Sequence, residues 1–400
     1  MPRQNDCKSQ GYTGSIAFCV ALNACITAAF SATLPIFLTV KLGATYFDAS
    51  LFMVAGTLSS SAAVYMLGRI GDVPRLRYPI TIATALCGLA GSLCLALATN
   101  YWVYFLVFAS LIAIAGSLFS QLMALAFIND RSSTGFIRAL ASAGWVAGPP
   151  FGGLIATVYS QAAVFYAAAA AYALLAVFIV GTKAFFSQKT PFAAESAKPA
   201  AQGTSGQQSI VLTVLTLSSV HLLISICALG IPWRLAQIGG TEFHVGLAFS
   251  IAAAIEVPII AGSNAIRNRF GYARILLLSC ALLCVYFLTA ALMENLFGLI
   301  SLSVINGIVT GTMMGLSLIV LQERLADRPA HASSIYSNIL RLSYVGALLV
   351  AGVIAQIISV VAIFWIAGVM AFCLCVGLVV WRPFGSMDAF AAEAPRHGQS

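Results

Sequence analysis

Long apolar runs recur along the whole chain, and they limit its possible folds more than any other feature. A helix of about 20 apolar residues spans the hydrocarbon of a bilayer, and it satisfies its own backbone hydrogen bonds there. Twelve runs are long enough, at 15–40, 47–67, 78–98, 101–125, 136–158, 161–182, 209–230, 244–265, 274–293, 297–321, 333–356 and 358–381. The sequence therefore predicts an all-α integral membrane protein with twelve transmembrane helices.

The balance of apolar and charged residues excludes an ordinary soluble protein. Hydrophobic residues make up 60% of the chain and charged residues 8%, whereas soluble domains carry about 25% charged residues. Removing the apolar runs leaves no stretch long enough for a soluble domain of ordinary size. The segment 1–12 is polar and the run after it is long enough to span, so we expect no cleavable signal peptide.

The basic residues sort to one side of the predicted spans. With the N-terminus placed in the cytoplasm, sixteen of the twenty Lys and Arg residues fall in cytoplasmic segments. Lys41 and Arg234 fall on the opposite side, and Arg138 and Arg341 lie in or at the edge of runs. This positive-inside bias predicts that both termini are cytoplasmic. It also accounts for the net charge of +8 without a nucleic-acid partner.

One long polar connection divides the runs into two sets of six. Residues 183–208, between the sixth and seventh runs, are rich in Ala, Ser, Gln, Gly and Lys, a composition typical of a linker. We therefore expect an N-terminal bundle at 1–182, a C-terminal bundle at 209–382 and a short cytoplasmic tail at 383–400. Such six-plus-six repeats are typical of secondary transporters, whose substrate site lies near the middle of the membrane between the halves.

The loop after the second run resembles a family signature. It holds Gly68, Asp72, Arg75 and Arg77, which partly match the GxxxDRxGRR motif of the major facilitator superfamily, with Val73 in place of the usual Arg. The resemblance to that superfamily extends over most of both halves. It implies a fold of two pseudo-symmetric six-helix bundles, and it gives this loop the role of a charge latch that biases one conformation.

A second copy of this loop follows the eighth run. It keeps Arg269, Phe270 and Gly271, while Asn268 stands where the acid of the family pattern would stand. The resemblance therefore implies a weaker charge relay in the C-terminal half.

Three stretches are more specifically similar to the bacterial sugar efflux transporters. They are 121–126 (QLMALA) with the following Arg138 and SAGWVAGPP, then 253–258 (AAIEVP), and finally 321–323 with 332–338. The resemblance implies a monomeric transporter of sugar-like molecules in the bacterial inner (plasma) membrane, with no cofactor. The glycine-rich end of the fifth run also looks like a motif of superfamily antiporters, which favours export.

That end of the fifth run is an unusual break in an apolar segment. Gly148, Pro149 and Pro150 would favour a turn in water, because proline removes a backbone donor and glycine favours bends. In a bilayer such residues are tolerated, because neighbouring helices satisfy the freed carbonyls and small residues let backbones approach. Two interpretations stay open: a kinked packing helix, and a helix bent at an interface between moving bundles.

Glu256 is the strongest candidate for proton coupling. It lies about halfway along the eighth run, where an ionised carboxylate is costly and usually functional. The proton affinity of a carboxylate depends on its burial and on nearby charges, so an alternating environment could load and unload a proton. A structural ion pair, a fixed hydrogen bond to the backbone at Pro258, and a hydrogen bond to substrate hydroxyls are the alternatives.

Three other ionisable residues lie within or at the edge of runs. His221, in the seventh run, is a second proton-coupling candidate because histidine titrates near neutral pH, with a simple hydrogen bond as the alternative. Arg341 lies about two turns into the eleventh run, where it could pair with Glu256, point at substrate or snorkel. Arg138 lies nearer the cytoplasmic edge, where we expect it to pair with Asp130.

Polar and aromatic side chains within the runs are the candidates for substrate binding and gating. Unpaired charges are few among them, which favours a neutral polyhydroxyl ligand over a strongly charged one. Trp145 and Trp233 could stack on a sugar ring, although Trp233 could instead anchor the chain at the interface. The predicted substrate-binding residues are Asn23, Gln121, Trp145, Glu256, Asn306, Asn338 and Arg341. The predicted gating residues are Gly68, Asp72, Arg75, Arg77, Arg138, Gly148, Pro149, Pro150, Arg269 and Gly271.

The sequence offers no constellation for catalysis or metal binding. The ten cysteines are scattered, and the closest pairs, Cys280/Cys284 and Cys373/Cys375, lack partners at metal-site spacing. No Ser/His/Asp set or His-x-x-x-His pair is present in the runs. We therefore expect neither an enzyme nor a metal site.

Together these features predict a proton-driven exporter, an antiporter, of sugars or glycosides that works by alternating access of its two halves. Export of another small amphipathic molecule, such as a drug or siderophore, is the alternative, and an importer is a weaker variant of it. The expected partners are a sugar-like small molecule, protons and the lipid bilayer. An intramembrane enzyme is disfavoured because the runs hold no catalytic set, and a sensor is disfavoured because the tail after Trp381 is too short for a soluble domain.

Overall fold

The structure is a computed structural model that describes residues 4–71, 73, 75–129, 134–183, 207–325 and 329–381. These residues form helices and no strands. Among them, twelve helical segments are long and apolar enough to cross a membrane, from Thr13–Lys41 to Val360–Val380. The prediction of an all-α protein with twelve spans is confirmed.

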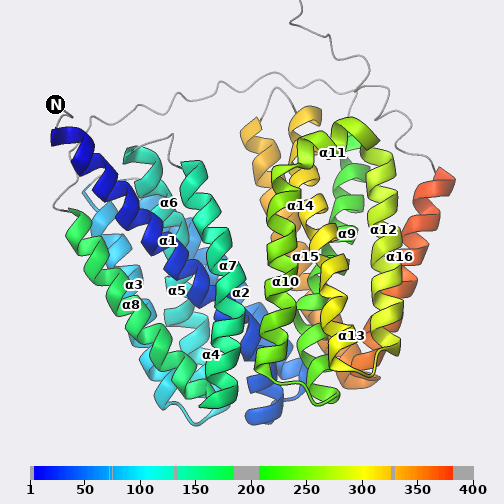
Figure 1. Ribbon diagram of the computed structural model, residues 1–400, viewed down its shortest axis with the longest axis horizontal. Helices are drawn as coiled ribbons and strands as arrows, with labels where there is room; N and C mark the ends of the chain where they lie inside the picture. Colours follow the sequence, from blue (N-terminus) through cyan, green and yellow to red (C-terminus); the bar gives the residue numbers. More distant parts are fainter. Residues whose placement is uncertain are drawn as a thin grey trace, which may run out of the picture. The chain divides into compact units, whose positions relative to one another are not determined.

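The first six spans are formed by the elements up to α8 (Figure 1). The fourth span is the most broken, because a π-helical segment and a turn interrupt it. The elements are α1 (Gln4–Ile36), η1 (Phe37–Lys41), α2 (Tyr46–Gly71), α3 (Arg77–Leu97), α4 (Tyr101–Val107), η2 (Phe108–Ile112), α5 (Ala113–Ala115), α6 (Leu118–Asn129), α7 (Thr134–Val158) and α8 (Gln161–Lys183).

The last six spans are formed by the elements from α9 onward, and the short helix α11 follows the eighth span on the cytoplasmic side of the predicted topology. The elements are α9 (Gln207–Gln237), α10 (Glu242–Ala261), α11 (Ser263–Phe270), α12 (Tyr272–Leu292), α13 (Leu296–Ser301), α14 (Ser303–Arg324), α15 (Pro329–Ile357) and α16 (Val360–Trp381).

The fourth and tenth spans begin in the same way, as the predicted repeat requires. Asn100 caps α4 by accepting a hydrogen bond at Oδ1 from the Trp102 backbone nitrogen at 2.8 Å. Asn295 caps α13 by accepting one from the Gly298 backbone nitrogen at 2.6 Å. An Asn at this position satisfies one of the backbone donors left free at a helix start. The two halves therefore share a local start signal six spans apart.

Packing divides the chain into two compact units. The first comprises Met1–Ser196 and Ile231–Ala253, and the second comprises Ala197–Gly230 and Ala254–Ser400. The division therefore falls inside α9 and again inside α10. The bundle boundaries predicted from the linker, 1–182 and 209–382, follow chain order instead, and they stay a prediction.

Helix α1 lies at the core of the first unit, where it packs against α6, α7 and α8. Glycines spaced four residues apart on α7 face α1, so the two backbones approach closely. A Cβ atom on Gly148 would lie 2.9 Å from the Cα of Cys25, and one on Gly152 would lie 2.9 Å from the Cα of Ala29. In the second unit α12 packs against α14 and α16, and α14 packs against α15.

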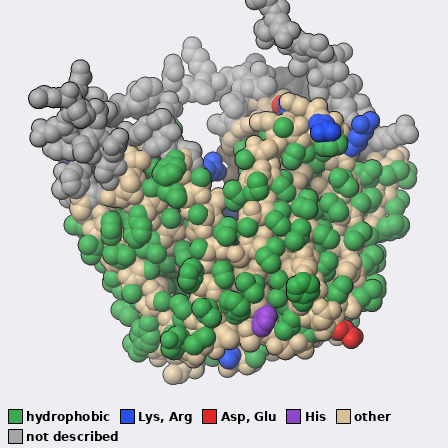
Figure 2. Space-filling view, in the orientation of Figure 1, with side chains coloured by type: hydrophobic (Ala, Val, Ile, Leu, Met, Phe, Trp, Pro, Cys, Tyr) green, Lys and Arg blue, Asp and Glu red, His purple; other side chains and the backbone are tan. Residues whose placement is uncertain are grey.

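The outer surface fits a lipid environment. The face shown in Figure 2 carries hydrophobic side chains across its middle, and most of the visible charged side chains lie toward its upper and lower edges. Large apolar side chains such as Phe297 and Val380 are 84% and 77% exposed. In water such exposure would be unfavourable, whereas lipid chains solvate it, so the chain is a multi-pass membrane protein.

Candidate functional site

Glu256 lies on α10, in the part of this helix that belongs to the second unit. Its side chain is half-buried. Within the described ranges, the structure records neither an ion pair nor a side-chain hydrogen bond for its carboxylate. The pairing with Arg341 that the sequence left open is therefore not formed there. An ionisable group inside a span without a partner is expensive, which keeps Glu256 the leading candidate for a functional role.

Helix α14 runs directly beside Glu256. A Cβ atom on Gly311 would lie 2.8 Å from the Glu256 carbonyl oxygen and 3.0 Å from its Cα, so the two backbones touch. On the same helix Thr310 Oγ1 donates to Asn306 Oδ1 at 2.9 Å, which orients the Asn306 amide. Glu256 is therefore packed directly against α14 within the second unit.

The other predicted substrate residues on helical surfaces remain accessible. Asn338 and Arg341, on α15 of the second unit, are exposed. On α7 of the first unit, Trp145 is 43% exposed and Arg138 is also exposed. Each of these side chains presents surface that a ligand or lipid can contact.

Three residues of the first unit that we predicted as substrate contacts are instead buried, and one of them, Gln121, is 3% exposed. Asn23 on α1 is 4% exposed, and its Oδ1 has no hydrogen-bond partner among the described residues. Trp233 is 1% exposed; its indole nitrogen lies 3.4 Å from the Pro35 carbonyl oxygen, and its ring packs edge-on against Tyr46. Trp233 therefore presents no open ring face for stacking on a sugar in this structure.

His221 is part of a buried polar contact between α9 and α14. Its side chain is 3% exposed, and its Nε2 lies 3.0 Å from the Ser317 hydroxyl. The ring of Tyr336 on α15 approaches edge-on at 6.3 Å, and the Tyr336 hydroxyl donates to the Met314 carbonyl at 3.0 Å. This geometry favours the simple hydrogen bond that the sequence left open for His221, while its proton-coupling role stays a prediction.

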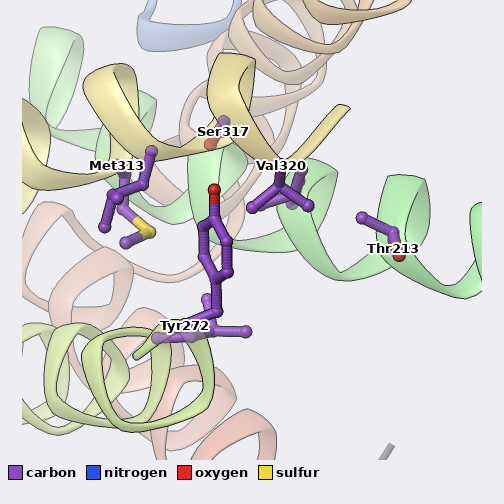
Figure 3. Close-up of a pocket in the computed structure, with 8 residues that line it drawn as sticks. Thr213, Tyr272, Met313, Ser317 and Val320 are labelled. Carbon is purple, nitrogen blue, oxygen red and sulfur yellow. The ribbon is translucent and has the colours of Figure 1, made fainter. Parts of the chain in front are cut away.

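A small cavity lies beside this contact, within the second unit. The space between its walls amounts to about 340 Å³ with open solvent included, so the enclosed part is small. Figure 3 shows the Tyr272 ring directed from α12 toward Ser317 on α14, with Val320 and Met313 on either side. The lining is mostly apolar, and Glu256 is not part of it. The cavity is therefore distinct from the candidate proton site.

Gln121 contacts the end of α2 and the start of the predicted latch loop. Its Oε1 would lie 2.7 Å from a Cβ atom placed on Gly71, and Arg77 Nε donates to the Gly71 carbonyl at 3.1 Å. Gln121 thus groups with the gating residue Arg77, although its substrate role stays a prediction. Asp72 lies outside the described residues, as does the proposed Asp130 partner of Arg138.

The corresponding loop of the second unit contains a direct ion pair. Arg267 pairs with Glu323 at the end of α14, and its Nε and Nη2 donate to Asn268 Oδ1 at 3.1 and 2.9 Å. Asn268 therefore orients the guanidinium as a neutral acceptor, and α14 supplies the acid. We expected Asn268 to weaken the charge relay of this loop. The Arg267–Glu323 ion pair nevertheless places opposite charges there. Gly271 turns the chain with φ of +74°, a conformation that favours glycine.

The remaining predicted gating residues lie in α2, in the turn that follows it, in α11 or in α7. Arg75 is exposed, and the guanidinium of Arg269, also exposed, lies 5.5 Å from the Phe270 ring centre. Gly68 has open space around its Cα. Pro149 and Pro150 lie inside α7, which continues through them. Their position inside a continuous helix does not test a gating role. Gating therefore stays a prediction for all of these residues.

The structure thus brings some predicted residues together and leaves others apart. Gln121 meets Arg77 through Gly71, whereas His221 and Glu256 have different neighbours. Sequence reasoning missed Gly311, Ser317 and Glu323, which contact Glu256, His221 and Arg267. A signal for Gly311 was present, because glycines recur every four residues at 307, 311 and 315, the small-residue spacing of close helix pairs.

No group of three or more His, Cys, Asp or Glu side chains could hold a metal ion within the described ranges. The described cysteines are free thiols. Glu256 and the neighbouring Asn306 and Thr310 of α14 therefore offer a carboxylate and hydrogen-bonding groups rather than a set of metal ligands. Such groups can bind a polar molecule and exchange a proton, which is the chemistry of a membrane transport protein.

The fold and this set of residues define a polytopic transport protein. The family model of the Major Facilitator Superfamily matches residues 16–233, and the chain belongs to this superfamily. It is therefore a transporter rather than an enzyme.

Two relatives within this superfamily show a more specific resemblance. Sugar efflux transporter A of Escherichia coli (strain K12) is 22% identical over 349 residues, covering 85% of this chain and 88% of the relative. Sugar efflux transporter C of the same organism is 23% identical over 355 residues, covering 86% of this chain and 90% of the relative. The chain resembles the sugar efflux transporters over most of its length.

Solved structures agree on the fold. The crystal structure of nucleoside transporter NupG matches with a TM-score of 0.75 at 14% identity, over 92% of this chain and 98% of that one. The POT family transporter PepTSo matches with a TM-score of 0.73 at 12% identity, over 94% and 98%. At such identities the likeness concerns the fold alone.

Proposed function

We propose that this protein exports sugars or glycosides across the bacterial inner membrane in exchange for protons, by alternating access of its two halves. The names of the relatives support the substrate class, and the distribution of basic residues supports cytoplasmic termini. We take the working unit to be a monomer, as the family resemblance implies. The observation that carries the proposal is Glu256, a half-buried carboxylate within a span that has no ion-pair partner among the described residues.

Glu256 is the proton carrier in this proposal. A carboxylate inside the membrane is costly when charged and much less so when protonated, so its charge state responds to which side of the membrane it faces. Protonation from the outside and release to the cytoplasm then accompany the outward movement of substrate. Because Glu256 is accessible at its surface, a substrate hydroxyl can contact the same carboxylate.

The substrate contacts come from amide, guanidinium and aromatic groups. Asn306, Asn338 and Arg341 of the second unit offer donors for sugar hydroxyls, and Trp145 of the first unit offers an exposed indole face. Charged groups are few among them, which suits a neutral polyhydroxyl molecule. The latch loops at Gly68–Arg77 and Arg267–Gly271 act as gates rather than as substrate contacts.

The experiment that tests this proposal is collapse of a proton gradient in everted vesicles that contain the protein. A panel of mono- and disaccharides and glycosides is added, and the decay of the gradient is followed with a pH-sensitive dye. We expect sugar-specific collapse that disappears in Glu256→Gln and persists in Glu294→Gln, a matched change of an exposed acid outside the spans. Collapse by cationic dyes or siderophores but by no sugar would replace the substrate class and keep the coupling. Full-rate sugar-driven collapse in Glu256→Gln would remove the assigned role of Glu256.

A further inference from the structure

The contact between Glu256 and Gly311 carries an inference that rests on the proposed function and deepens it. We propose that Gly311 is a positioning residue for Glu256: the missing side chain at 311 lets the backbone of α10 lie against α14, and this contact sets where the carboxylate stands. Nothing in the resemblance or the comparisons assigns a role to Gly311.

The geometry at Gly311 is a contact of backbone with backbone. A Cβ atom there would meet the Glu256 carbonyl oxygen at 2.8 Å, the Glu256 Cα at 3.0 Å and the Ile259 Cβ at 3.1 Å. Real Cβ atoms essentially never come within 3.0 Å of another heavy atom. None of the three atoms can rotate away, because each belongs to the backbone or is attached directly to it. Any side chain at 311 must therefore move α10 and α14 apart at this level.

The contact one turn further along α14 is of a different kind. A Cβ atom on Gly315 would overlap the Ser263 hydroxyl, and it would lie 2.7 Å from the Ser263 Cβ. The Ser263 hydroxyl donates within its own segment, to the carbonyls of Ile259 and Ile260 at 3.1 and 2.7 Å. A hydroxyl can change rotamer, so part of this overlap can be relieved without moving the helix. The Ser263 Cβ cannot rotate away, so a side chain at 315 also displaces its neighbour, but that neighbour is the first residue of α11 and not Glu256.

A change in the helix separation at Gly311 also moves the Glu256 carboxylate. Restoring ordinary van der Waals contact requires α10 to move by about 0.6 Å at this level. The atoms displaced are the Cα and carbonyl of Glu256, so the whole side chain moves with them. No ion pair or hydrogen bond within the described ranges holds the carboxylate in its old place.

The glycine spacing alone would indicate only close helix packing. Glycines at 307, 311 and 315 form the small-residue pattern by which membrane helices approach each other. What assigns a functional role to the middle glycine is its neighbour: the residue directly against it is the acid in the middle of this span, and no partner is recorded for that acid among the described residues. A packing glycine elsewhere in the second unit has no such neighbour, as at Gly346, where a Cβ atom would meet only the Leu222 Cδ1 at 3.4 Å.

Chemical labelling of Glu256 tests the proposal directly on the full-length protein. Carbodiimide modifies membrane-embedded carboxyl groups, and mass spectrometry of the peptide that contains Glu256 gives the labelling rate at a fixed pH. We expect Gly311→Ala to change this rate at least threefold. The matched control Gly346→Ala, which meets only ordinary contact, is expected to stay within twofold of the unsubstituted chain.

Transport kinetics on the same variants supply the second readout. Gly311→Ala is expected to change KM or the maximal rate of sugar-driven proton movement about fivefold, and this change should vanish in a Glu256→Gln background. If Gly311→Ala lowers thermal stability while labelling of Glu256 is unchanged, Gly311 is a packing residue and the proposal is overturned. If labelling changes but neither Gly311→Ala nor Glu256→Gln affects proton movement, the positioning role stands and the proposed function fails.

A second variant covers the case in which Gly311→Ala is not recovered folded. Gly315→Val carries branched bulk that a Ser263 rotamer change cannot clear, so it pushes α14 away from Ser263 at the start of α11 and from Ile260 near the end of α10. Labelling of Glu256 must then also change, by about twofold or more. An unchanged labelling rate in a folded Gly315→Val protein would overturn the proposal.

Discussion

The two ends of α10 pack against their neighbours in opposite ways. Near its start, Gly246 lies against the backbone of Pro149 on α7, and Ser250 Oγ donates to the Val146 carbonyl at 2.7 Å. This region belongs to the first unit. It combines close backbone approach with an interhelical hydrogen bond. The first residue of α10, Glu242, also lies backbone to backbone against Gly153 of α7, and it is 4% exposed.

Toward its end, in the second unit, α10 makes an equally close contact of a different character. Glu256 lies against Gly311, and no interhelical hydrogen bond of the Glu256 side chain is recorded among the described residues. Close contact between a glycine and a neighbouring backbone therefore occurs once beside an interhelical hydrogen bond and once beside the acid in the middle of the span. We infer that the first contact mainly holds structure, whereas the second leaves a group whose protonation can change. Variants should separate these roles by their effects on stability and on proton coupling.

The largest effect is expected for Gly246→Val. Its Cβ would overlap the Pro149 carbonyl oxygen, and the added methyl groups leave the backbones no room. Overpacking of this kind costs about 1–3 kcal/mol, and separation of α10 from α7 should reduce transport more than tenfold. Transport rate and thermal unfolding of the purified protein check this. Gly377→Val on α16, where a Cβ meets nothing within 4 Å, is the control. Equal behaviour of the two variants would show that the α7 contact does not matter.

Glu256→Asp should have the next largest effect. It changes the end of α10 that packs against α14. The substitution keeps an acid but withdraws the carboxyl by one methylene. We expect transport to fall about three- to tenfold, because misplacement of a reacting group by about 1 Å is costly, while sugar-driven proton movement remains detectable. Glu294→Asp is the control. A complete loss of proton movement would mean that the position of the carboxyl matters as much as its presence.

His221→Asn tests whether coupling is confined to Glu256. The variant loses the contact of Nε2 with the Ser317 hydroxyl, and a buried hydrogen bond of this kind contributes about 0.5–1.5 kcal/mol. We expect a lower unfolding temperature and a transport rate within twofold of the original, with proton movement retained. Loss of proton movement in a folded His221→Asn protein would transfer the coupling role to His221.

The sequence was sufficient for the twelve spans, because length and hydropathy are local properties. Glu256 was also identifiable from sequence alone, since an acid in the middle of an apolar run stands out regardless of its neighbours. The second start signal, Asn295 six spans after Asn100, supports the same repeat that the loops indicated.

Contacts between distant segments could not be predicted in the same way. The Arg267–Glu323 pair joins residues that are far apart in sequence, and the pattern around Asn268 indicated a weakened relay instead. Burial was equally hard to foresee: Trp233 looked like a stacking surface or an interface anchor, yet it is 1% exposed because it packs on Tyr46 and Pro35. Ion pairs and burial depend on which helix packs against which. Apolar runs of uniform composition do not show which side of a helix faces its neighbour.

Ser250→Ala is expected to have the smallest effect, and it completes the comparison. The variant removes the hydrogen bond from Ser250 to the Val146 carbonyl and leaves the glycine contact in place. Interhelical hydrogen bonds in membranes contribute about 0.6 kcal/mol on average, so the unfolding temperature should fall by about 1–2 °C. Ser219→Ala is the matched control, because its hydroxyl donates only within its own helix, to the Leu215 carbonyl at 2.9 Å. Proton coupling should be unchanged in both variants. If Ser250→Ala instead altered coupling without altering stability, the division of α10 into a structural end and a proton-binding end would be wrong.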